Sequence, residues 1–272
     1  MKSVVKKSLQ KLHVIDLARN IYNSFNTFSI SLFLSERKYR NSGLPDHLPA
    51  PPSNLIFLII GLRWATVYWR SGNEIFEEIQ FVLKKNSIDL KPSDSVLDFG
   101  CGCGRIIRHF YYHIKDVHFF GSDYNPQLIE WCKSNLLFAH FSTNKLLPPL
   151  EYGSDQFNLI YARSVFTHIG SELQKIWMHE LRRVLKVGGY LYISTHGEST
   201  FIKLDKNVIE ELKSNGIASV NQNIEGDNKC TVFQTKKYFE ENLLEGFELM
   251  DFISGGAKKK LSQDIYLLKR IN

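Results

Sequence analysis

The sequence has few cysteines, no long apolar run and no internal repeat, and each absence excludes a class of protein. Its four cysteines lack the spacing of a common zinc site, and Cys101 and Cys103 lie inside a glycine-rich stretch where a disulfide would be badly placed. The longest apolar run, 55–62, is too short to span a bilayer. The N-terminus lacks the continuous apolar region of a cleaved signal peptide. We therefore expect a reduced, cytoplasmic protein without a structural metal.

The charge is unevenly distributed along the 272 residues. Residues 1–40 account for the whole formal net charge of +6, so residues 41–272 are neutral overall. An enzyme that acts on nucleic acid carries its basic surface on the folded body. The charge distribution therefore disfavours DNA or RNA as a partner. The apolar content of 43% is enough for one large α/β domain with an extension.

Residues 1–40 form a basic, amphipathic N-terminal arm in which two helical stripes are separated near His13. One interpretation is a surface that contacts anionic lipid at the inner face of the membrane, as a peripheral protein would. The other is an ordinary helical extension packed on the core, because amphipathicity is the usual property of surface helices. Residues 41–92 follow as a helical cap, after a proline-rich stretch at 45–52 that indicates an extended linker or a boundary.

The chain is organised around the stretch from Val96 to Arg105, which reads V-L-D-F-G-C-G-C-G-R. An apolar strand ends at Asp98, three glycines alternate at positions 100, 102 and 104, and a helical pattern begins at Ile106. Glycine accepts a positive φ and lets a ligand approach the backbone. A second acid about 20 residues after the first, here Asp123, indicates a nucleoside with a free ribose. The third glycine comes one residue earlier than in the dinucleotide pattern G-x-G-x-x-G.

Strands and helices alternate from Ser93 onward. Asn125 before Pro126 predicts a helix start, and Ser171 with Gln174 predicts a capping box at the start of another helix. We expect buried strands at 157–162 and 190–194, a helix near 208–212, a helix capped by Thr235, and two final strands at 247–252 and 265–268.

The stretch D-F-G-C-G-C-G-R resembles the first motif of class I S-adenosylmethionine-dependent methyltransferases. Four further pieces follow in the order of that family: Asp123, D-x-F-N-L-I at 155–160, L-R-R-V-L-K-x-G-G at 181–189, and Gln263 with Asp264. The segments at 48–52 and 164–168 also resemble a bacterial subgroup of these enzymes. The resemblance implies an α/β fold, a Rossmann-like, mostly parallel sheet of seven strands with helices on both faces and an antiparallel hairpin at one edge. It places the methyltransferase domain at 93–272, with 197–232 as an acceptor-side insertion.

The resemblance also implies the cofactor, S-adenosylmethionine, and residues that bind it. Gly100, Gly102 and Gly104 would line its methionine part, Asp98 would lie near its ammonium group, and Asp123 would take both ribose hydroxyls. The remaining cofactor positions that the resemblance implies are Phe99, Tyr124, Asn144 beside the adenine edge, and Ala162 and Arg163 beside the sulfonium. Two positions depart from the family pattern: Asn158 stands where Asp is usual, and Arg163 is large for a position beside a cation.

An in-line methyl transfer depends mostly on alignment, but an oxygen acceptor can also need a base. His168 and His196 are the candidates, because each follows the carboxyl end of a predicted strand. The alternative for either residue is a structural hydrogen bond to the backbone. No Asn-Pro-Pro-Tyr or Asp-Pro-Pro-Tyr sequence follows the strand at 157–162, which disfavours methylation of nucleic-acid bases. A small molecule fits best as acceptor, for example a sugar or a lipid-linked intermediate.

Two rival functions remain at this point. A NAD(P)-dependent oxidoreductase explains the strand, turn and helix as well as Asp123, but not the early third glycine or the final hairpin. A non-catalytic cofactor-binding protein on the same fold explains every motif, although intact cofactor positions argue against loss of function.

Overall fold

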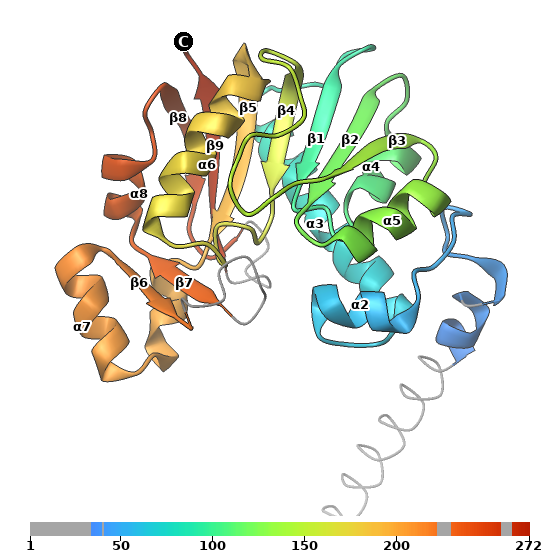
Figure 1. The fold of residues 1–272 in the computed structure, drawn as a ribbon, viewed down its shortest axis with the longest axis horizontal. Helices are drawn as coiled ribbons and strands as arrows, with labels where there is room; N and C mark the ends of the chain where they lie inside the picture. The colour runs from blue at the N-terminus through green and yellow to red at the C-terminus, as the bar shows by residue number, and fades with distance from the viewer. Residues whose placement is uncertain (1–33, 40, 222–229, 257–262) are drawn as a thin grey trace, which may run out of the picture.

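The computed structural model describes residues 34–39, 41–221, 230–256 and 263–272. A sheet of seven strands forms its centre, in the order β3-β2-β1-β4-β5-β9-β8 (Figure 1). Every pair from β3 to β5 is parallel, and β9 is antiparallel to both of its neighbours. The strands are β1 (Ser95–Phe99), β2 (His118–Asp123), β3 (Ala139–Thr143), β4 (Phe157–Ala162), β5 (Leu185–Thr195), β8 (Phe247–Ile253) and β9 (Asp264–Arg270). The predicted seven-stranded, mostly parallel sheet with an antiparallel edge hairpin is confirmed.

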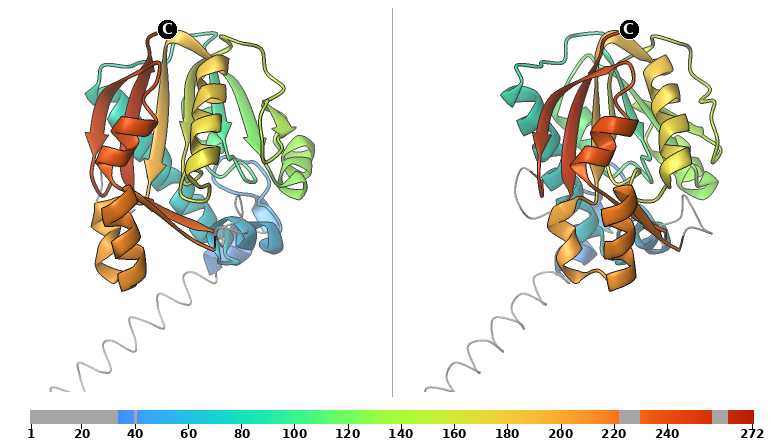
Figure 2. Two further views of the ribbon diagram at one scale, coloured as in Figure 1. Left: turned by 60° about the vertical axis from the view of Figure 1, so that its left-hand side comes forward. Right: turned by 90° about the vertical axis from the view of Figure 1, so that its left-hand side faces the viewer.

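Helices cover both faces of this sheet, and α3 and α6 lie on opposite faces (Figure 2). Alternate residues of each central strand face opposite sides, so Val96 packs with α3 while Leu97 packs with α6. Both faces of the strands are therefore apolar, as parallel sheets require. The helices are α2 (Ser53–Ile60), α3 (Ala65–Lys85), α4 (Ile107–His113), α5 (Pro126–Asn135), α6 (Ser171–Val184), α7 (Lys206–Asn215) and α8 (Lys236–Asn242).

Two predicted helix starts have different outcomes. Asn125 caps α5 as predicted, because its side chain accepts a hydrogen bond from the backbone of Gln127 and Pro126 occupies the first turn. The predicted capping box of Ser171 and Gln174 is wrong, since Gly170 is the N-cap of α6. The side chain of Gln174 is instead buried and donates to the carbonyls of Phe166 and Ile169. It fastens the loop after β4 and does not cap the helix.

The segment 197–232 is more regular than its polar sequence indicates. It contains the 3-10 helix η1 (Glu198–Lys203), the predicted helix as α7, and β6 (Ile217–Val220). Strand β6 pairs with β7 (Thr231–Gln234) to form a second, two-stranded sheet that the sequence did not indicate. This unit and α2 both lie at the end of the main sheet where β4 and β5 terminate (Figure 1).

The proline-rich stretch before α2 is not extended throughout: the backbone N–H of Leu44 donates to the carbonyl of Leu48 (3.1 Å), so 45–48 is a turn, and a buried ion pair fixes this turn to the body. The guanidinium of Arg108 in α4 donates from Nε to Asp46 Oδ2 (2.5 Å) and from a terminal nitrogen to Asp46 Oδ1 (2.9 Å). Both side chains are fully buried. Leu44 is also buried, whereas Pro45 is exposed, so Leu44 and Asp46 are the two residues of this turn that reach the core. In the described part of the chain, no helix is long and apolar enough to cross a membrane. The stripes predicted within residues 1–33 lie outside the described residues.

We expect Asp46→Asn to lower the free energy of unfolding by about 3 kcal/mol, because it leaves the guanidinium of Arg108 buried without its counter-charge. Urea denaturation measures the change. The matched control is Glu241→Gln, which removes an exposed ion pair with Lys237 (3.7 Å) and should cost less than about 0.5 kcal/mol. Equal losses in the two variants would contradict the structural role of the buried pair.

Candidate active site

The glycine turn connects β1 to α4 and is held by the end of β2. Gly100, Gly102 and Gly104 all have positive φ, at 80°, 57° and 75°. The backbone N–H groups of Gly100 and Cys101 both donate to the carbonyl of Ser122, at 2.8 and 3.0 Å. Other residues rarely adopt this backbone conformation, so the alternating glycines and the neighbouring strand together set the shape of the turn.

Two apolar side chains from other elements approach this turn closely. A Cβ on Gly100 would lie 2.3 Å from Val165 Cγ2, in the loop after β4, and a Cβ on Gly102 would lie 2.8 Å from Ile59 Cδ1 of α2. From the sequence, we attributed the glycines to the approach of a ligand to the backbone. The structure adds a second reason, because the missing side chains also let Val165 and Ile59 reach the backbone.

Asp98, at the carboxyl end of β1, has an unpaired oxygen. The residue is 1% exposed, and its Oδ2 has no hydrogen-bond partner among the described residues. Burial raises the pKa of Asp98 to about 8, while Tyr161 and Arg105 oppose the rise. A buried polar atom without a partner is costly, and a cation at this position would satisfy it. The site therefore fits the positively charged ammonium of the predicted cofactor.

Asp123 and Asn144 come together where β2 and β3 end. Asp123 accepts backbone hydrogen bonds from Gly102 (Oδ2, 2.8 Å) and Asn125 (Oδ1, 2.8 Å). Burial raises its pKa, and these two hydrogen bonds oppose the rise. Each carboxylate oxygen keeps a further lone pair for a ligand hydroxyl. Asn144 accepts from the Ser122 hydroxyl at 2.7 Å, and its backbone N–H donates to the carbonyl of Asp123.

Two of the predicted cofactor residues, Tyr124 and Phe99, differ in whether their rings are accessible to a ligand. Tyr124 is 51% exposed and follows Asp123 directly, so its ring is accessible to a ligand. The ring of Phe99 is buried against Trp177, with the centroids 4.7 Å apart. Only the backbone of Phe99 is therefore available to line the turn. Its predicted contact with the cofactor remains a prediction, as do the other assigned contacts.

Arg163 follows the fully buried Ala162 at the end of β4, and its charge is balanced by a residue that the sequence analysis missed. Its Nε lies 3.6 Å from Glu78 Oε1 of α3, with both side chains at most 2% exposed. A terminal nitrogen of Arg163 donates to the Ser194 hydroxyl at 3.0 Å. The nearby carboxylate explains how a large, charged arginine is accommodated at this buried position. The signal was present in the sequence, because Glu78 interrupts the apolar stripe of Ile75, Ile79 and Val82.

The two candidate bases lie at the ends of β4 and β5, joined by β7. The backbone N–H of Val232 donates to the carbonyl of Thr167, and that of Gln234 donates to the carbonyl of His196. His168 Nδ1 lies 2.6 Å from the carbonyl oxygen of Cys230. A carbonyl oxygen can only accept, so Nδ1 carries the hydrogen and Nε2 has the free lone pair. Burial lowers the pKa of His196 to about 4, with smaller contributions from His168 and Arg163, which keeps its ring neutral.

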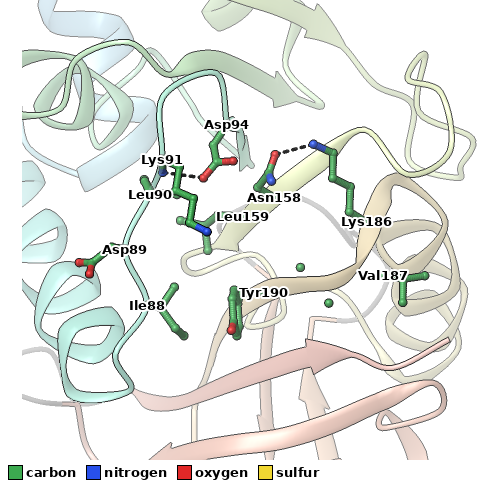
Figure 3. A pocket seen from close by; sticks show the side chains of 12 residues that line it. Ile88, Asp89, Leu90, Lys91, Asp94, Asn158, Leu159, Lys186, Val187 and Tyr190 are labelled. Atoms are coloured by element: carbon green, nitrogen blue, oxygen red, sulfur yellow. Dashed lines mark hydrogen bonds between the residues drawn. The ribbon is translucent and has the colours of Figure 1, made fainter.

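A separate cavity of about 230 Å³ lies at the opposite end of the sheet (Figure 3). It is lined by the amino ends of β4 and β5, including Asn158 and Lys186. The side chain of Asn158 accepts from the backbone N–H of Ser95 (3.0 Å) and from Lys186 Nζ (2.8 Å). Asn158, which stands where Asp is usual, therefore lies at the end of β4 that is remote from the glycine turn. Within the described ranges, no group of three His, Cys, Asp or Glu side chains could hold a metal ion.

The sheet order, the glycine turn and the acids at the ends of β1 and β2 together define a class I methyltransferase fold. The chain belongs to the family described as the methyltransferase domain, whose model matches residues 68–248. This match confirms the predicted class, S-adenosylmethionine-dependent methyltransferase, and with it the predicted cofactor. It replaces the rival assignment as a nicotinamide-dependent oxidoreductase.

Individual relatives are distant. A malonyl-[acyl-carrier protein] O-methyltransferase of Paenibacillus is 24% identical over 50% of this chain and 51% of that protein. A cyclopropane-fatty-acyl-phospholipid synthase of Escherichia coli is 26% identical over 54% of this chain and 37% of that protein. The chain thus spans about half the length, or less, of these curated relatives. The crystal structure of an S-adenosylmethionine-dependent methyltransferase from Methanosarcina mazei superposes with a TM-score of 0.55 at 20% identity, covering 70% of this chain and 97% of that one.

The raised pKa of Asp98 predicts opposite effects of Asp98→Asn on stability and on binding. The folded protein holds this proton up to about pH 8, whereas the unfolded chain loses it near pH 3.9. Wild-type stability therefore falls as pH rises through this window, and the variant lacks that loss. We expect Asp98→Asn to raise Tm relative to wild type more at pH 8 than at pH 5.

The same variant should bind S-adenosylmethionine at least about tenfold more weakly, since a buried charge-assisted contact is lost. Calorimetry at pH 6.5 in two buffers of different ionisation enthalpy should show one proton released per cofactor bound to wild type, and none for Asp98→Asn. Proton release that is equal in both proteins would contradict the assignment of Asp98 to the cofactor's ammonium.

Proposed function

We propose that the protein transfers the methyl group of S-adenosylmethionine to a small-molecule acceptor that lies between the loops after β4 and β5. The observation that carries this proposal is the placement of Asp98 and His168 at the same edge of one sheet. Asp98 offers an unpaired buried oxygen to a cation, and His168 offers a free ring nitrogen to a proton. A binding site for a charged cofactor and a base for an acceptor thus share the carboxyl ends of neighbouring strands.

The residues at the ends of β1 and β2 would hold the cofactor. When bound, S-adenosylmethionine would supply an electrophilic methyl group: the acceptor atom would bond to the methyl carbon while the carbon–sulfur bond breaks and S-adenosylhomocysteine leaves. Asp98 binds the ammonium end, Asp123 accepts from the ribose hydroxyls, and Asn144 with Tyr124 borders the adenine. Ala162 and Arg163 flank the reacting end. The carboxylate of Glu78 would offset the positive charge of Arg163, which would otherwise repel the sulfonium.

His168 is the stronger candidate for the base. Its tautomer is fixed by the carbonyl of Cys230, so Nε2 accepts the acceptor's proton without a change of ring orientation. His196 is held neutral by burial, and a pKa of about 4 makes its ring a weak base. It fits better as a hydrogen-bond partner that orients the acceptor.

The acceptor class follows from charge and from the relatives. The neutral overall charge of residues 41–272 supports a small molecule over a nucleic acid. The two curated relatives are named for an acyl-carrier-protein substrate and for a fatty-acyl phospholipid. Among the two acceptors considered from the sequence, these names favour a lipid-linked intermediate over a sugar. The basic arm at 1–40 would then bring the enzyme to an anionic lipid surface.

A thermal-shift panel tests the cofactor. S-adenosylmethionine and S-adenosylhomocysteine should each stabilise the protein by roughly 2.7 kcal/mol at about 100 times the dissociation constant, whereas NAD and NADP should not. Asp123→Ala should abolish the shift while the protein remains folded. Stabilisation by a nicotinamide nucleotide alone, or an unchanged affinity of Asp123→Ala, would overturn the assignment.

The base is tested with His168→Gln, which keeps a hydrogen-bonding side chain but cannot accept a proton. We expect kcat to fall by about 10²-fold or more, with the thermal shift by S-adenosylmethionine unchanged. The control is His179→Gln, an exposed histidine on α6, which should retain wild-type kcat. A wild-type protein that binds cofactor but methylates nothing across sugar and lipid-linked acceptors would favour the non-catalytic alternative.

A further inference from the structure

Helix α2 carries an exposed apolar face that the proposed chemistry does not use. Its sequence, S-N-L-I-F-L-I-I, has no charged residue. Leu55 and Ile56 are buried in the core, and Ile59 covers Gly102. The opposite side of the helix and the turn after it leave four large side chains 36% to 48% exposed. These residues, here called the α2 outer face, are Phe57, Leu58, Leu62 and Trp64.

The α2 outer face differs from the other exposed apolar side chains. Leu137, Val187 and Ile271 are more exposed, but each lies on a different element, and single exposed apolar residues are ordinary. The four residues of the α2 outer face fall within eight positions of sequence. Arg63 turns back over the ring of Phe57, 4.9 Å from its centroid, so the turn and the helix form one surface. A contiguous apolar patch of this kind marks an interaction site.

The charges beside this face are basic. Glu36 accepts from the backbone N–H of Thr66 (3.0 Å) and from its hydroxyl (3.3 Å), which fixes the helical segment 34–39 to the start of α3. The exposed Arg37 and Lys38 thus follow directly after a residue that contacts Thr66, which is two positions from Trp64 of the α2 outer face. The only other acid among the described residues from 34 to 66 is Asp46, which is buried with Arg108. Arg37 and Lys38 are therefore exposed cations in segments whose described residues hold no exposed acid.

We propose that the α2 outer face docks on an anionic lipid bilayer. Apolar and aromatic side chains enter the boundary between head groups and acyl chains, while Arg37 and Lys38 meet the lipid phosphates. Charge decides between this occupant and a second copy of the chain, because self-association would bring two basic rims together. The excess positive charge of residues 1–40 has the sign that the same surface requires.

The position of α2 gives this docking a consequence for the acceptor. The inner side of the helix contacts the glycine turn through Ile59, so the lipid surface and the cofactor site lie on two sides of one helix. A lipid-anchored acceptor could then reach the site while its acyl chains remain in the bilayer. This consequence rests on the proposed function, whereas the docking itself does not.

Sedimentation of the full chain with vesicles tests the docking. Wild type should sediment with vesicles of phosphatidylcholine and phosphatidylglycerol, and much less with phosphatidylcholine alone. The double variant Phe57→Ser and Leu62→Ser should bind at least about tenfold more weakly, on the scale of burying two large apolar side chains. The matched control, Leu137→Ser with Val187→Ser, removes two apolar residues that are more exposed and lie elsewhere on the surface, and it should bind like wild type.

A second measurement needs no weakened variant. Bromine-labelled lipids should quench tryptophan fluorescence of the wild type. Trp64→Phe should lose most of that quenching, since Trp177 is buried in the core and the half-buried Trp69 and Trp131 lie on α3 and α5, outside the α2 outer face. The thermal shift by S-adenosylmethionine is followed on every variant. Loss of vesicle binding with that shift intact supports docking, and an absent shift in wild type would count against the proposed function alone. Equal binding of the two double variants, or a dimer that the Phe57 and Leu62 changes dissociate, would overturn the docking.

Discussion

The buried contact between Glu78 and Arg163 connects the helical cap to the strands that end at the site. Glu78 belongs to α3, whereas Arg163 follows β4, and the Tyr192 hydroxyl of β5 donates to the same carboxylate at 2.9 Å. A charge pair without solvent tolerates little displacement, because either partner alone would be an uncompensated buried charge. The contact therefore fixes α3 relative to β4 and β5. The loops that carry His168 and His196 begin within five residues of these anchors.

Local patterns were enough to predict the main elements of the central sheet, but not β6 and β7. The glycine turn, the strands at β1 and β4, and the N-cap at Asn125 are each determined by residues close in sequence. The capping box failed for a physical reason. Gln174 has the right spacing from Ser171, but the burial of its amide against two loop carbonyls outweighs a bond at the helix start. Sequence spacing records a possible local contact and says nothing about a competing distant one.

The parts of the site that could not be predicted from the sequence depend on contacts between residues far apart in the chain. Glu78 and Arg163 are 85 positions apart in the chain, and the carbonyl that fixes the tautomer of His168 belongs to Cys230. Strand β7, which crosses the loops after β4 and β5, pairs with β6 in a polar segment without alternation of apolar residues. The predicted residues were brought to one edge of the sheet, but their partners came from elements whose role only packing reveals.

The electrostatics of this edge also explain which class of cofactor it suits. Asp98 and Asp123 are both buried there, and the charge of Asp123 contributes to the raised pKa of Asp98. A pyrophosphate placed against them would add negative charge where the charge of Asp123 already opposes ionisation of Asp98. A ligand with an ammonium and a sulfonium relieves that repulsion and stabilises the ionised acids. The early third glycine and the two buried acids therefore both favour S-adenosylmethionine as the cofactor. The glycine does so through the shape of the turn, and the acids do so through the charge of the site.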